Sequence, residues 1–407
     1  MSTGCDIAIV ADDLTGALDA AAPFAERGMS TRVAVTLEGL EAALGGDEGA
    51  PRVVSVNTGS RHLGRDAAAR RAGEAAERLL AQRPRLLLKK VDSTLRGQVV
   101  AEAAALRHLA GQRRLLVCPA VPSQGRCVLG GEVWVEGEPL SATAYARDGL
   151  SPALTGPLRG SFAAGGVSLV RHVAEAGQPL PMTDCVVDAT DDPTLTRIAE
   201  QLLEAPGDWL PVCAAGLTQA LARSLALPKS LALSKNPTST RCTGTVSRPA
   251  MLPAPARTLF ALGSRSPRAR RQLEMLREAF PEVPCLPAFS PAGDHKGCRE
   301  CIIVPGVPAD RAASAKAVAA AMAEAVAAAR GEARGVLLFL CGGDIALAVL
   351  ERLGGDYIEL AGEWRPGVPL GHVNGDAERP VMTKAGGFGP EDLLVQLLAG
   401  IRHSSKA

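Results

Sequence analysis

The chain has 407 residues, of which 47% are hydrophobic and only 3% aromatic, and its formal net charge is +1. A chain of this length holds two or three domains of about 100 to 200 residues each. The near-neutral charge argues against a general polyanion-binding surface, so we expect no nucleic-acid partner. We also expect no membrane partner, because no apolar run approaches the roughly 20 residues of a membrane span. The ten cysteines stand singly, mostly in apolar runs, and no signal-peptide pattern opens the chain, which together predict a cytoplasmic protein with reduced thiols.

The first apolar run, residues 6–11, ends abruptly in Asp12, Asp13 and Thr15, and a helix-forming segment follows at 17–27. A short apolar run followed by turn residues and a helix predicts the first strand of an open α/β sheet. Ligands of such sheets bind beyond the carboxyl ends of the strands, where these side chains would lie. One helix N-cap, worth about 1 kcal/mol, accounts for one of the polar residues but not for two adjacent acids.

Strand and helix patterns alternate through the rest of the first half. Strands are predicted at 31–35, 53–56, 86–89 and 115–118, and helices at 66–82 and 99–109. This alternation favours a largely parallel sheet with helices on both faces. Residues 123–145 break the pattern and predict a β-hairpin. The α/β pattern resumes at 185–187, and Asp192 before Pro193 predicts a capped helix start.

Residues 227–257 are rich in Pro, Ser, Thr and Lys and lack periodicity, which predicts a domain boundary. We therefore expect a first domain at 1–228, a linker at 229–257 and a second domain at 258–407. Each is expected to be α/β, a mainly parallel sheet flanked by helices, with a cleft between the two domains. In the second domain, strands are predicted at 258–262 and 336–340, and helices at 267–280, 312–329, 345–353 and 391–401.

Two further polar clusters follow predicted strands of the first domain. Residues 89–97 supply two lysines, an acid, two hydroxyls and an arginine, and residues 57–61 supply Asn, Thr, Ser and Arg. Carboxylates bind hydroxyl groups, and Lys or Arg bind a carboxylate or a phosphate, so the set suits a small polyhydroxy acid. The alternative is a group of solvated loops with Arg–Asp pairs. Three such clusters, all at strand ends, favour the binding site.

Three glycine-rich turns occupy the second domain, at 263–267, 341–344 and 383–389. None matches the Walker pattern or the dinucleotide-binding pattern. Glycine and serine at the amino end of a helix do attract phosphate, and three such turns in one domain indicate a nucleotide phosphate site. A sugar-acid site on one domain and a nucleotide site on the other suit phosphoryl transfer, which needs two aligned reactants and usually Mg²⁺.

Four motifs then resemble one known family: residues 11–17, 89–97, 342–344 and 383–389 are similar to the motifs of the four-carbon acid sugar kinases. The segments 119–122, 125–126 and 367–371 look like that family too. The resemblance spans nearly the whole chain, and the motifs come in the family's order. The run Asp-Ser-Thr-Leu-Arg-Gly at 92–97 is quite specific.

The resemblance implies ATP-dependent phosphorylation, with Mg²⁺, of the terminal hydroxyl of threonate, erythronate or 3-oxo-tetronate to the 4-phosphate. Carried over by motif, the expected substrate contacts are Asp12, Arg61, Lys90, Asp92, Ser93 and Thr94. The expected nucleotide contacts are Ser264, Gly342, Gly343, Asp344, Ile345, Gly386 and Gly387. Either Asp12 or Asp13 would orient or deprotonate the attacking hydroxyl. The metal ligands and the particular tetronate stay open, and a homodimer is the commonest oligomer to expect.

Two departures and two rival functions stand beside this interpretation. Ile345 and Ala385 replace a threonine and a serine that many relatives carry, which removes two hydroxyls from the phosphate site. An aspartyl-nucleophile phosphatase would need a second acid two positions after the first, where this chain has Leu14 and Thr15. A sugar-acid-binding sensor would leave the three glycine turns unexplained.

Overall fold

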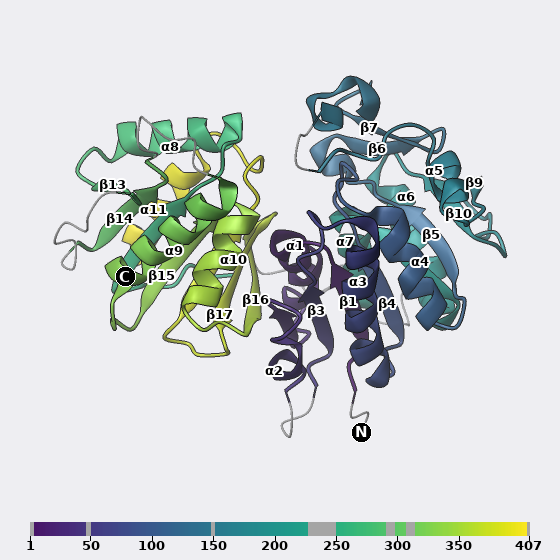
Figure 1. Cartoon of the computed structure of the whole chain (residues 1–407), viewed down its shortest axis with the longest axis horizontal. Helices are drawn as coiled ribbons and strands as arrows, with labels where there is room; N and C mark the ends of the chain where they lie inside the picture. The colour runs from purple at the N-terminus through teal and green to yellow at the C-terminus, as the bar shows by residue number, and fades with distance from the viewer. Residues whose placement is uncertain are drawn as a thin grey trace, which may run out of the picture. The chain divides into compact units, whose positions relative to one another are not determined.

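The computed structural model describes residues 4–45, 50–147, 151–226, 250–289, 298–306 and 314–404. The chain forms two compact units: Met1–Arg32 with Leu44–Arg248, and Val33–Ala43 with Pro249–Ala407. Each unit is an α/β structure with a mostly parallel sheet flanked by helices (Figure 1). Much of the predicted linker, residues 229–249, lies outside the described residues. In the part of the chain that the structure describes, no helix is long and apolar enough to cross a membrane.

In the described part of the first unit, seven parallel strands form the sheet. In spatial order they are β3 (Val53–Asn57), β1 (Ile7–Ala11), β4 (Leu86–Lys90), β11 (Trp209–Cys213), β5 (Arg114–Cys118), β10 (Cys185–Asp188) and β9 (Val170–Val173). The predicted strands at 53–56, 86–89, 115–118 and 185–187 are confirmed, each one residue longer than predicted. The central strands are apolar and buried, as expected when helices cover both faces of a parallel sheet.

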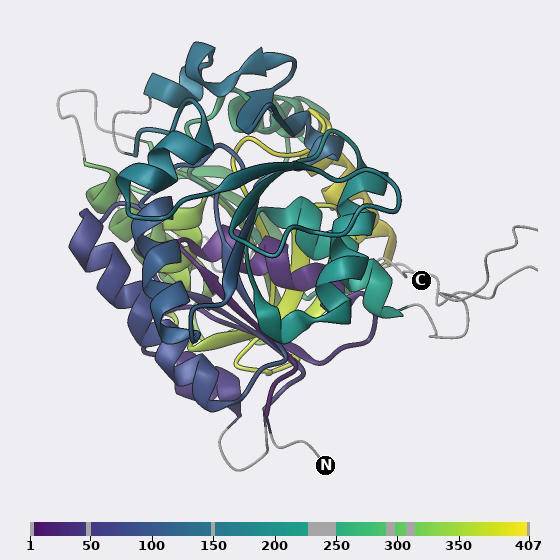
Figure 2. The ribbon, with the colours of Figure 1, turned by 90° about the vertical axis from the view of Figure 1, so that its right-hand side faces the viewer.

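Helices cover this sheet in two layers (Figure 2). α3 (Arg65–Ala81) and α4 (Val99–Leu109) pack against each other, and α1 (Leu14–Ala25), α7 (Ala215–Ala226) and α6 (Asp192–Glu204) form the other layer. α5 (Leu158–Ala164) is a shorter helix that precedes β9. The helices predicted at 66–82 and 99–109 are confirmed. The N-cap of α6 is Asp191, whose side chain accepts the N–H of Thr194, so the predicted cap at Asp192 was one residue late.

A small antiparallel sheet confirms the hairpin predicted within 123–145. It consists of β6 (Arg126–Leu129), β7 (Glu132–Val135) and β8 (Glu138–Pro139). Short 3₁₀ helices also occur among the described residues of this unit: η2 (Pro122–Gln124), η3 (Leu140–Ala142), η4 (Ala144–Arg147) and η5 (Pro206–Asp208). This sheet follows β5 in the chain, so it starts from the strand ends where α/β proteins bind ligands.

The sheet of the second unit is mixed. Its strands are β13 (Cys285–Pro287), β14 (Glu300–Val304), β12 (Arg257–Leu262), β15 (Val336–Cys341), β18 (Pro380–Lys384), β17 (Val368–Val373) and β16 (Tyr357–Arg365), in spatial order. The first five run parallel, whereas β17 runs antiparallel to both of its neighbours. The strands predicted at 258–262 and 336–340 are confirmed. The strands after residue 353 were not predicted.

The longer helices that flank the second sheet, among the residues that the structure describes, are α8 (Pro267–Ala279), α9 (Ala315–Arg330), α10 (Gly343–Arg352) and α11 (Leu393–Ser404). α9 packs on α10, and α8 packs on α11. Apolar residues of α8 and α11 share a core with the facing strand residues, among them Phe260 and Phe339. All four predicted helices are confirmed with shifted ends.

One segment of the first 45 residues belongs to the second unit. The boundary falls within β2 (Thr31–Ala34), and α2 (Leu40–Leu44) follows. Val35 N–H donates to the carbonyl oxygen of Asp356 at 2.9 Å. Gly39 lies so close to the same residue that a Cβ would stand 2.3 Å from the Asp356 oxygen. The second unit is therefore built from two separate parts of the chain.

Candidate functional site

The three polar loops of the first unit, which follow β1, β3 and β4, begin at the same edge of the sheet. Ala11, the last residue of β1, lies opposite Asn57 of β3 on one side and opposite Lys90 of β4 on the other. Because parallel strands share one carboxyl edge, the residues that follow them are neighbours in space. The structure thus brings together the loops that the sequence predicts to converge.

Arg61 joins the two adjacent aspartates (Asp12 and Asp13). Its Nε and Nη2 donate to Asp12 Oδ2 and Oδ1, both at 2.9 Å. Its Nη1 and Nη2 donate to Asp13 Oδ2 and Oδ1, both at 2.8 Å. The Asp12 and Arg61 side chains are only 3% and 11% exposed. Four of the five guanidinium N–H groups are therefore engaged, in the forked geometry that suits carboxylates.

The charges of this cluster keep its carboxylates ionised. Burial alone would raise the pKa of Asp12, but the positive charges of Arg61 and Lys89 outweigh burial and lower it. Burial opposes ionisation of Asp92 too, and Arg96 and Arg61 together hold its pKa well below the usual range. Near neutral pH both side chains are therefore hydrogen-bond acceptors only, as the binding of sugar hydroxyls requires.

The two aspartates differ in how fully their oxygens are used. Asp13 is the N-cap of α1 and accepts the N–H of Gly16 at 2.9 Å and the hydroxyl of Thr15 at 2.7 Å, besides Arg61. Each Asp13 oxygen therefore accepts two hydrogen bonds. The side chain of Asp12 accepts only from Arg61 among the described residues. Asp12 keeps the acceptor capacity that a ligand hydroxyl could use.

Lys89 and Lys90 point to opposite faces of the sheet, as successive strand residues do. Lys89 is fully buried and pairs with Glu102 of α4, Nζ to Oε2, at 2.6 Å. Lys90 lies on the side of α1, where its Nζ donates to the Val91 carbonyl at 2.9 Å. A Cβ on Gly16 would stand 3.2 Å from this Nζ, so the close approach of lysine and helix favours glycine.

The loop after β4 holds its own acid in place. The Thr94 hydroxyl donates to Asp92, and Arg96 donates to the same carboxylate through Nε at 2.7 Å and Nη2 at 3.2 Å. The Ser93 side chain is half-buried and has no hydrogen-bond partner among the described residues. Thr94 thus supports Asp92, while the hydroxyl of Ser93 is available to a ligand.

Two residues of this site were given no role in the sequence analysis: Gly97, which ends the 92–97 motif, and Asp19, which was not singled out. Gly97 has φ +90°, and a Cβ there would stand 2.9 Å from Asp12 Oδ2, so the loop requires glycine. Asp19 of α1 has a buried Oδ1 without a partner in the described chain. Burial raises the pKa of Asp19, against the lowering effect of Lys90. The spacing of Asp19 four residues after Thr15, on one helix face, is the signal that could have found it.

In the second unit, the three predicted glycine turns meet. The N–H of Gly342 donates to the carbonyl of Lys384 at 3.0 Å, which joins the second turn to the third. A Cβ on Gly386 would stand 1.9 Å from Ser264 Oγ, which joins the third turn to the first. The predicted nucleotide contacts therefore lie together, although Ser264 and Gly386 are 122 residues apart in the chain.

The start of α10 supplies free N–H groups to this cluster. Its N-cap, Gly342, has no side chain to cap the helix, so the N–H groups of Gly343, Asp344 and Ile345 have no intrahelical acceptor. Ile345 is buried against Gly263, where a Cβ would stand 2.4 Å from Ile345 Cγ1. The apolar side chain thus fills the turn, and the loss of the hydroxyl leaves the backbone donors in place.

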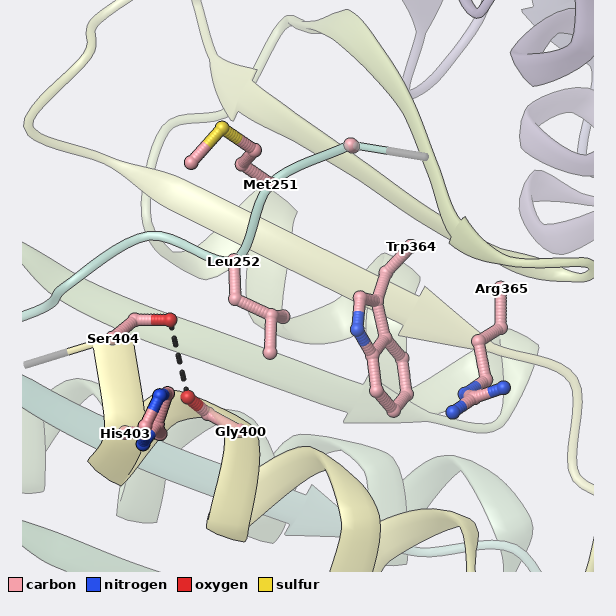
Figure 3. A pocket seen from close by; sticks show the side chains of 8 residues that line it. Met251, Leu252, Trp364, Arg365, Gly400, His403 and Ser404 are labelled. Atoms are coloured by element: carbon pink, nitrogen blue, oxygen red, sulfur yellow. Dashed lines mark hydrogen bonds between the residues drawn. The ribbon is translucent and has the colours of Figure 1, made fainter. Parts of the chain in front are cut away.

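A separate pocket of about 530 Å³ lies elsewhere in the second unit (Figure 3). Its lining residues are Ala250, Met251, Leu252, Trp364, Arg365, Gly400, His403 and Ser404. The guanidinium of Arg365 lies 5.0 Å from the centre of the Trp364 ring. None of the predicted nucleotide contacts lines this pocket, so we do not include it in the candidate site.

Comparison with known proteins gives each unit a family model. Residues 7–221 match the sugar-binding N-terminal domain model, and residues 305–394 match the nucleotide-binding C-terminal domain model. The first range contains the Arg61 cluster. The second contains Gly342 and Gly386, whereas Ser264 precedes it.

Individual relatives support the same assignment. A D-threonate kinase of Bordetella bronchiseptica is 34% identical over 98% of this chain and 98% of its own length. A D-erythronate kinase of Heliobacterium modesticaldum is 37% identical over 36% of this chain and 33% of its own length. A crystal structure from B. bronchiseptica, described as a domain-swapped dimer with bound citrate, is 30% identical over 98% of each chain with a TM-score of 0.51. This chain belongs to the four-carbon acid sugar kinase family.

Proposed function

We propose that this kinase transfers the γ-phosphoryl group of ATP to the terminal hydroxyl of D-threonate and forms the 4-phosphate. The observation that carries the proposal is the pair of aspartates held by Arg61 at the ends of adjacent parallel strands, within the range of the sugar-binding model. Relatives that match over nearly the whole chain are D-threonate kinases, which supports threonate as the substrate rather than erythronate or 3-oxo-tetronate.

The first unit would bind the acid sugar. Lys90 and the remaining N–H of Arg61 attract the substrate carboxylate, since both are cations in a buried setting. The hydroxyls of the sugar bind Asp12, Asp92 and Ser93. Thr94 acts on the substrate through Asp92, to which it donates.

Of the two candidate catalytic acids, we propose that Asp12 is the one that binds and orients the attacking hydroxyl. Asp13 is occupied as a helix cap, whereas Asp12 has acceptor capacity left. The low pKa of Asp12 makes it a weak base, so its main contribution is to orient the hydroxyl toward phosphorus. Phosphoryl transfer has little covalent chemistry for the protein to perform and depends on positioning and charge stabilisation.

The second unit would bind ATP through backbone N–H groups of the three glycine turns. The residues of these turns that would contact the nucleotide are Ser264, Gly342, Gly343, Ile345, Gly386 and Gly387. Asp344 is an exposed carboxylate in the first turn of α10. Mg²⁺ in kinases is usually held by one or two carboxylates together with the phosphates, so Asp344 fits the ion. Bound with ATP, Mg²⁺ would neutralise phosphate charge.

An ADP-release assay with a panel of four-carbon acids tests the proposal. We expect turnover with D-threonate to exceed that with L-threonate, D-erythronate and 3-oxo-tetronate at equal concentration. Release of ADP no faster than without an acceptor would refute the activity, and a faster reaction with another tetronate would refute the substrate. Isothermal titration with Mg-ATP separates the kinase from a sugar-acid sensor, which would not bind the nucleotide.

We also propose that the protein is a homodimer, because a related crystal structure is described as a domain-swapped dimer. Size-exclusion chromatography with light scattering measures the mass directly. A mass equal to the 42.0 kDa of one chain would refute the dimer.

A further inference from the structure

Lys384 binds the backbone of the glycine turn that follows it. Its Nζ donates three hydrogen bonds, to the carbonyl oxygens of Ala385 at 2.9 Å, Gly386 at 3.1 Å and Phe388 at 3.0 Å. The side chain is only 1% exposed. All three N–H groups of the ammonium are therefore directed at carbonyls of its own loop.

A second buried side chain binds the rest of the same loop. Nε2 of Gln272, from α8, donates to the carbonyl oxygens of Phe388 at 2.9 Å and Pro390 at 2.7 Å, with a longer contact of 3.4 Å to Gly389. Gln272 is fully buried and uncharged. The loop is thus fixed from two sides, by one cation and by one neutral amide.

The carbonyl groups that accept hydrogen bonds from Lys384 determine where the N–H groups of the loop point. In a planar trans peptide, the C=O of one residue and the N–H of the next point in opposite directions. The carbonyls of Ala385 and Gly386 are turned toward Lys384, so the N–H groups of Gly386 and Gly387 are turned away from it. Neither N–H has an acceptor within the described part of the chain. Successive N–H groups that face one way form an anion-binding concavity.

The positive charge of Lys384 has no counter-charge of its own. Within the described residues, no carboxylate lies within ion-pair distance of its Nζ, and Arg268 adds further positive potential. Burial lowers the pKa of Lys384, which the nearby Cys341 thiol opposes. An isolated buried charge is costly unless an opposite charge approaches.

We propose that Lys384 is a positioning residue of the nucleotide site. Its ammonium holds the loop carbonyls inward, so that Gly386 and Gly387 present their N–H groups to the nucleotide phosphates. Its own charge, acting through the loop, attracts these phosphates. The inference rests on the proposed binding of ATP to this unit. It adds that the ammonium of Lys384 increases the affinity of the site for the nucleotide phosphates.

Isothermal titration of the full-length protein with adenosine and with ADP tests the role of the charge. Lys384→Met removes the charge and the hydrogen bonds. Gln272→Met is the matched control, because it releases the same loop without a change of charge. Lys384→Gln is a second neutral variant whose amide can still donate to two carbonyls, and Lys384→Arg keeps the charge. Circular dichroism identifies the variants that fold.

We expect the neutral Lys384 variants to weaken ADP binding by about 10- to 100-fold more than adenosine binding, the range for one unit charge acting over several ångströms near a protein surface. Gln272→Met loosens the same loop but leaves the charge in place, so it should reduce the preference for ADP over adenosine by less than the neutral Lys384 variants do. Lys384→Arg should restore part of that preference. Equal losses for adenosine and ADP in the neutral variants, or no loss, would overturn the inference. A wild-type protein that binds no ADP would instead refute the proposed function.

Discussion

The buried contact of Arg61 with two aspartates makes a quantitative prediction about stability. Arg61→Met keeps an apolar stem of similar length but leaves Asp12 and Asp13 without their cation. Asp12 is nearly inaccessible to water, so its charge would be buried and unpaired. We expect the variant to lose activity and also free energy of unfolding, because an uncompensated buried charge is one of the costliest defects in a folded protein.

The size of the effect follows from the burial. Removal of one partner from a buried pair costs about 3 to 5 kcal/mol. At roughly 2 to 4 °C per kcal/mol for a domain of 150 to 250 residues, the first unit should unfold at a temperature about 6 to 20 °C lower. The partial exposure of Asp13 favours the lower half of this range, since water can solvate that carboxylate.

In Arg61→Met, the effect of Asp12 on stability as the pH falls should have the opposite sign from that in the wild type. The folded-state pKa of Asp12 is lowered, so its contribution to wild-type stability is fully present above the unfolded-state pKa of about 3.9 and is lost as pH falls below it. In Arg61→Met the burial remains and the main lowering charge is gone, so the pKa of Asp12 should rise above its ordinary value. The free energy of unfolding of this variant should then increase as the pH falls from 7 to 5. In the wild type, Asp12 should not change the free energy of unfolding over this pH range.

Urea unfolding at pH 7 and pH 5 measures both effects. Replacement of Trp364 by Phe leaves Trp134 and Trp209, so that tryptophan fluorescence reports on the first unit alone. Adding Asp12→Asn to Arg61→Met removes the orphaned charge and should recover at least about 1 kcal/mol. A variant equally destabilised at both pH values, with no recovery in the double variant, would show that the charges are not the cause.

Three further changes test other parts of the two sites. Asp12→Asn should lower kcat for D-threonate by at least about 100-fold in an ADP-release assay, and near-normal turnover would remove this side chain from the mechanism. Gly386→Ala places a methyl group 1.9 Å from Ser264 Oγ and should raise the KM for ATP at least about tenfold with an unchanged circular dichroism spectrum; an unaltered KM would contradict the proposed turn. Glu102→Gln leaves Lys89 buried without its partner and should cost about 3 to 5 kcal/mol in thermal unfolding, whereas an unchanged Tm would mean that the pair contributes nothing net.

Much of the sugar-acid site could be predicted because its residues follow apolar strands. The carboxyl edge of a parallel sheet is readable from local sequence, and the strands that precede Asp12, Arg61 and Lys90 predict that these residues lie together. The partners could not be read in this way. Arg61 contacts acids 48 and 49 residues away, and no local pattern says which of several acids an arginine meets. The occupation of Asp13 as a helix cap likewise depends on where α1 begins.

The strands after residue 353 escaped prediction for a different reason. The pairing of β16 with β17 shifts register between Leu360 and Gly362 and again between Glu363 and Arg365. Each shift interrupts the two-residue alternation that identifies a half-buried strand. Gly371 in β17 adds another weak point, because glycine is rare in strand interiors.

The discontinuous build of the second unit limits how this protein can be divided. A fragment that starts at residue 250 would lack residues 33–43, and the Asp356 carbonyl would lose the N–H of Val35. Leu37 and Leu40, which are buried in the intact chain, would be absent from it as well. Separate expression of a nucleotide-binding half therefore calls for a circularly permuted or grafted polypeptide that restores the missing eleven residues.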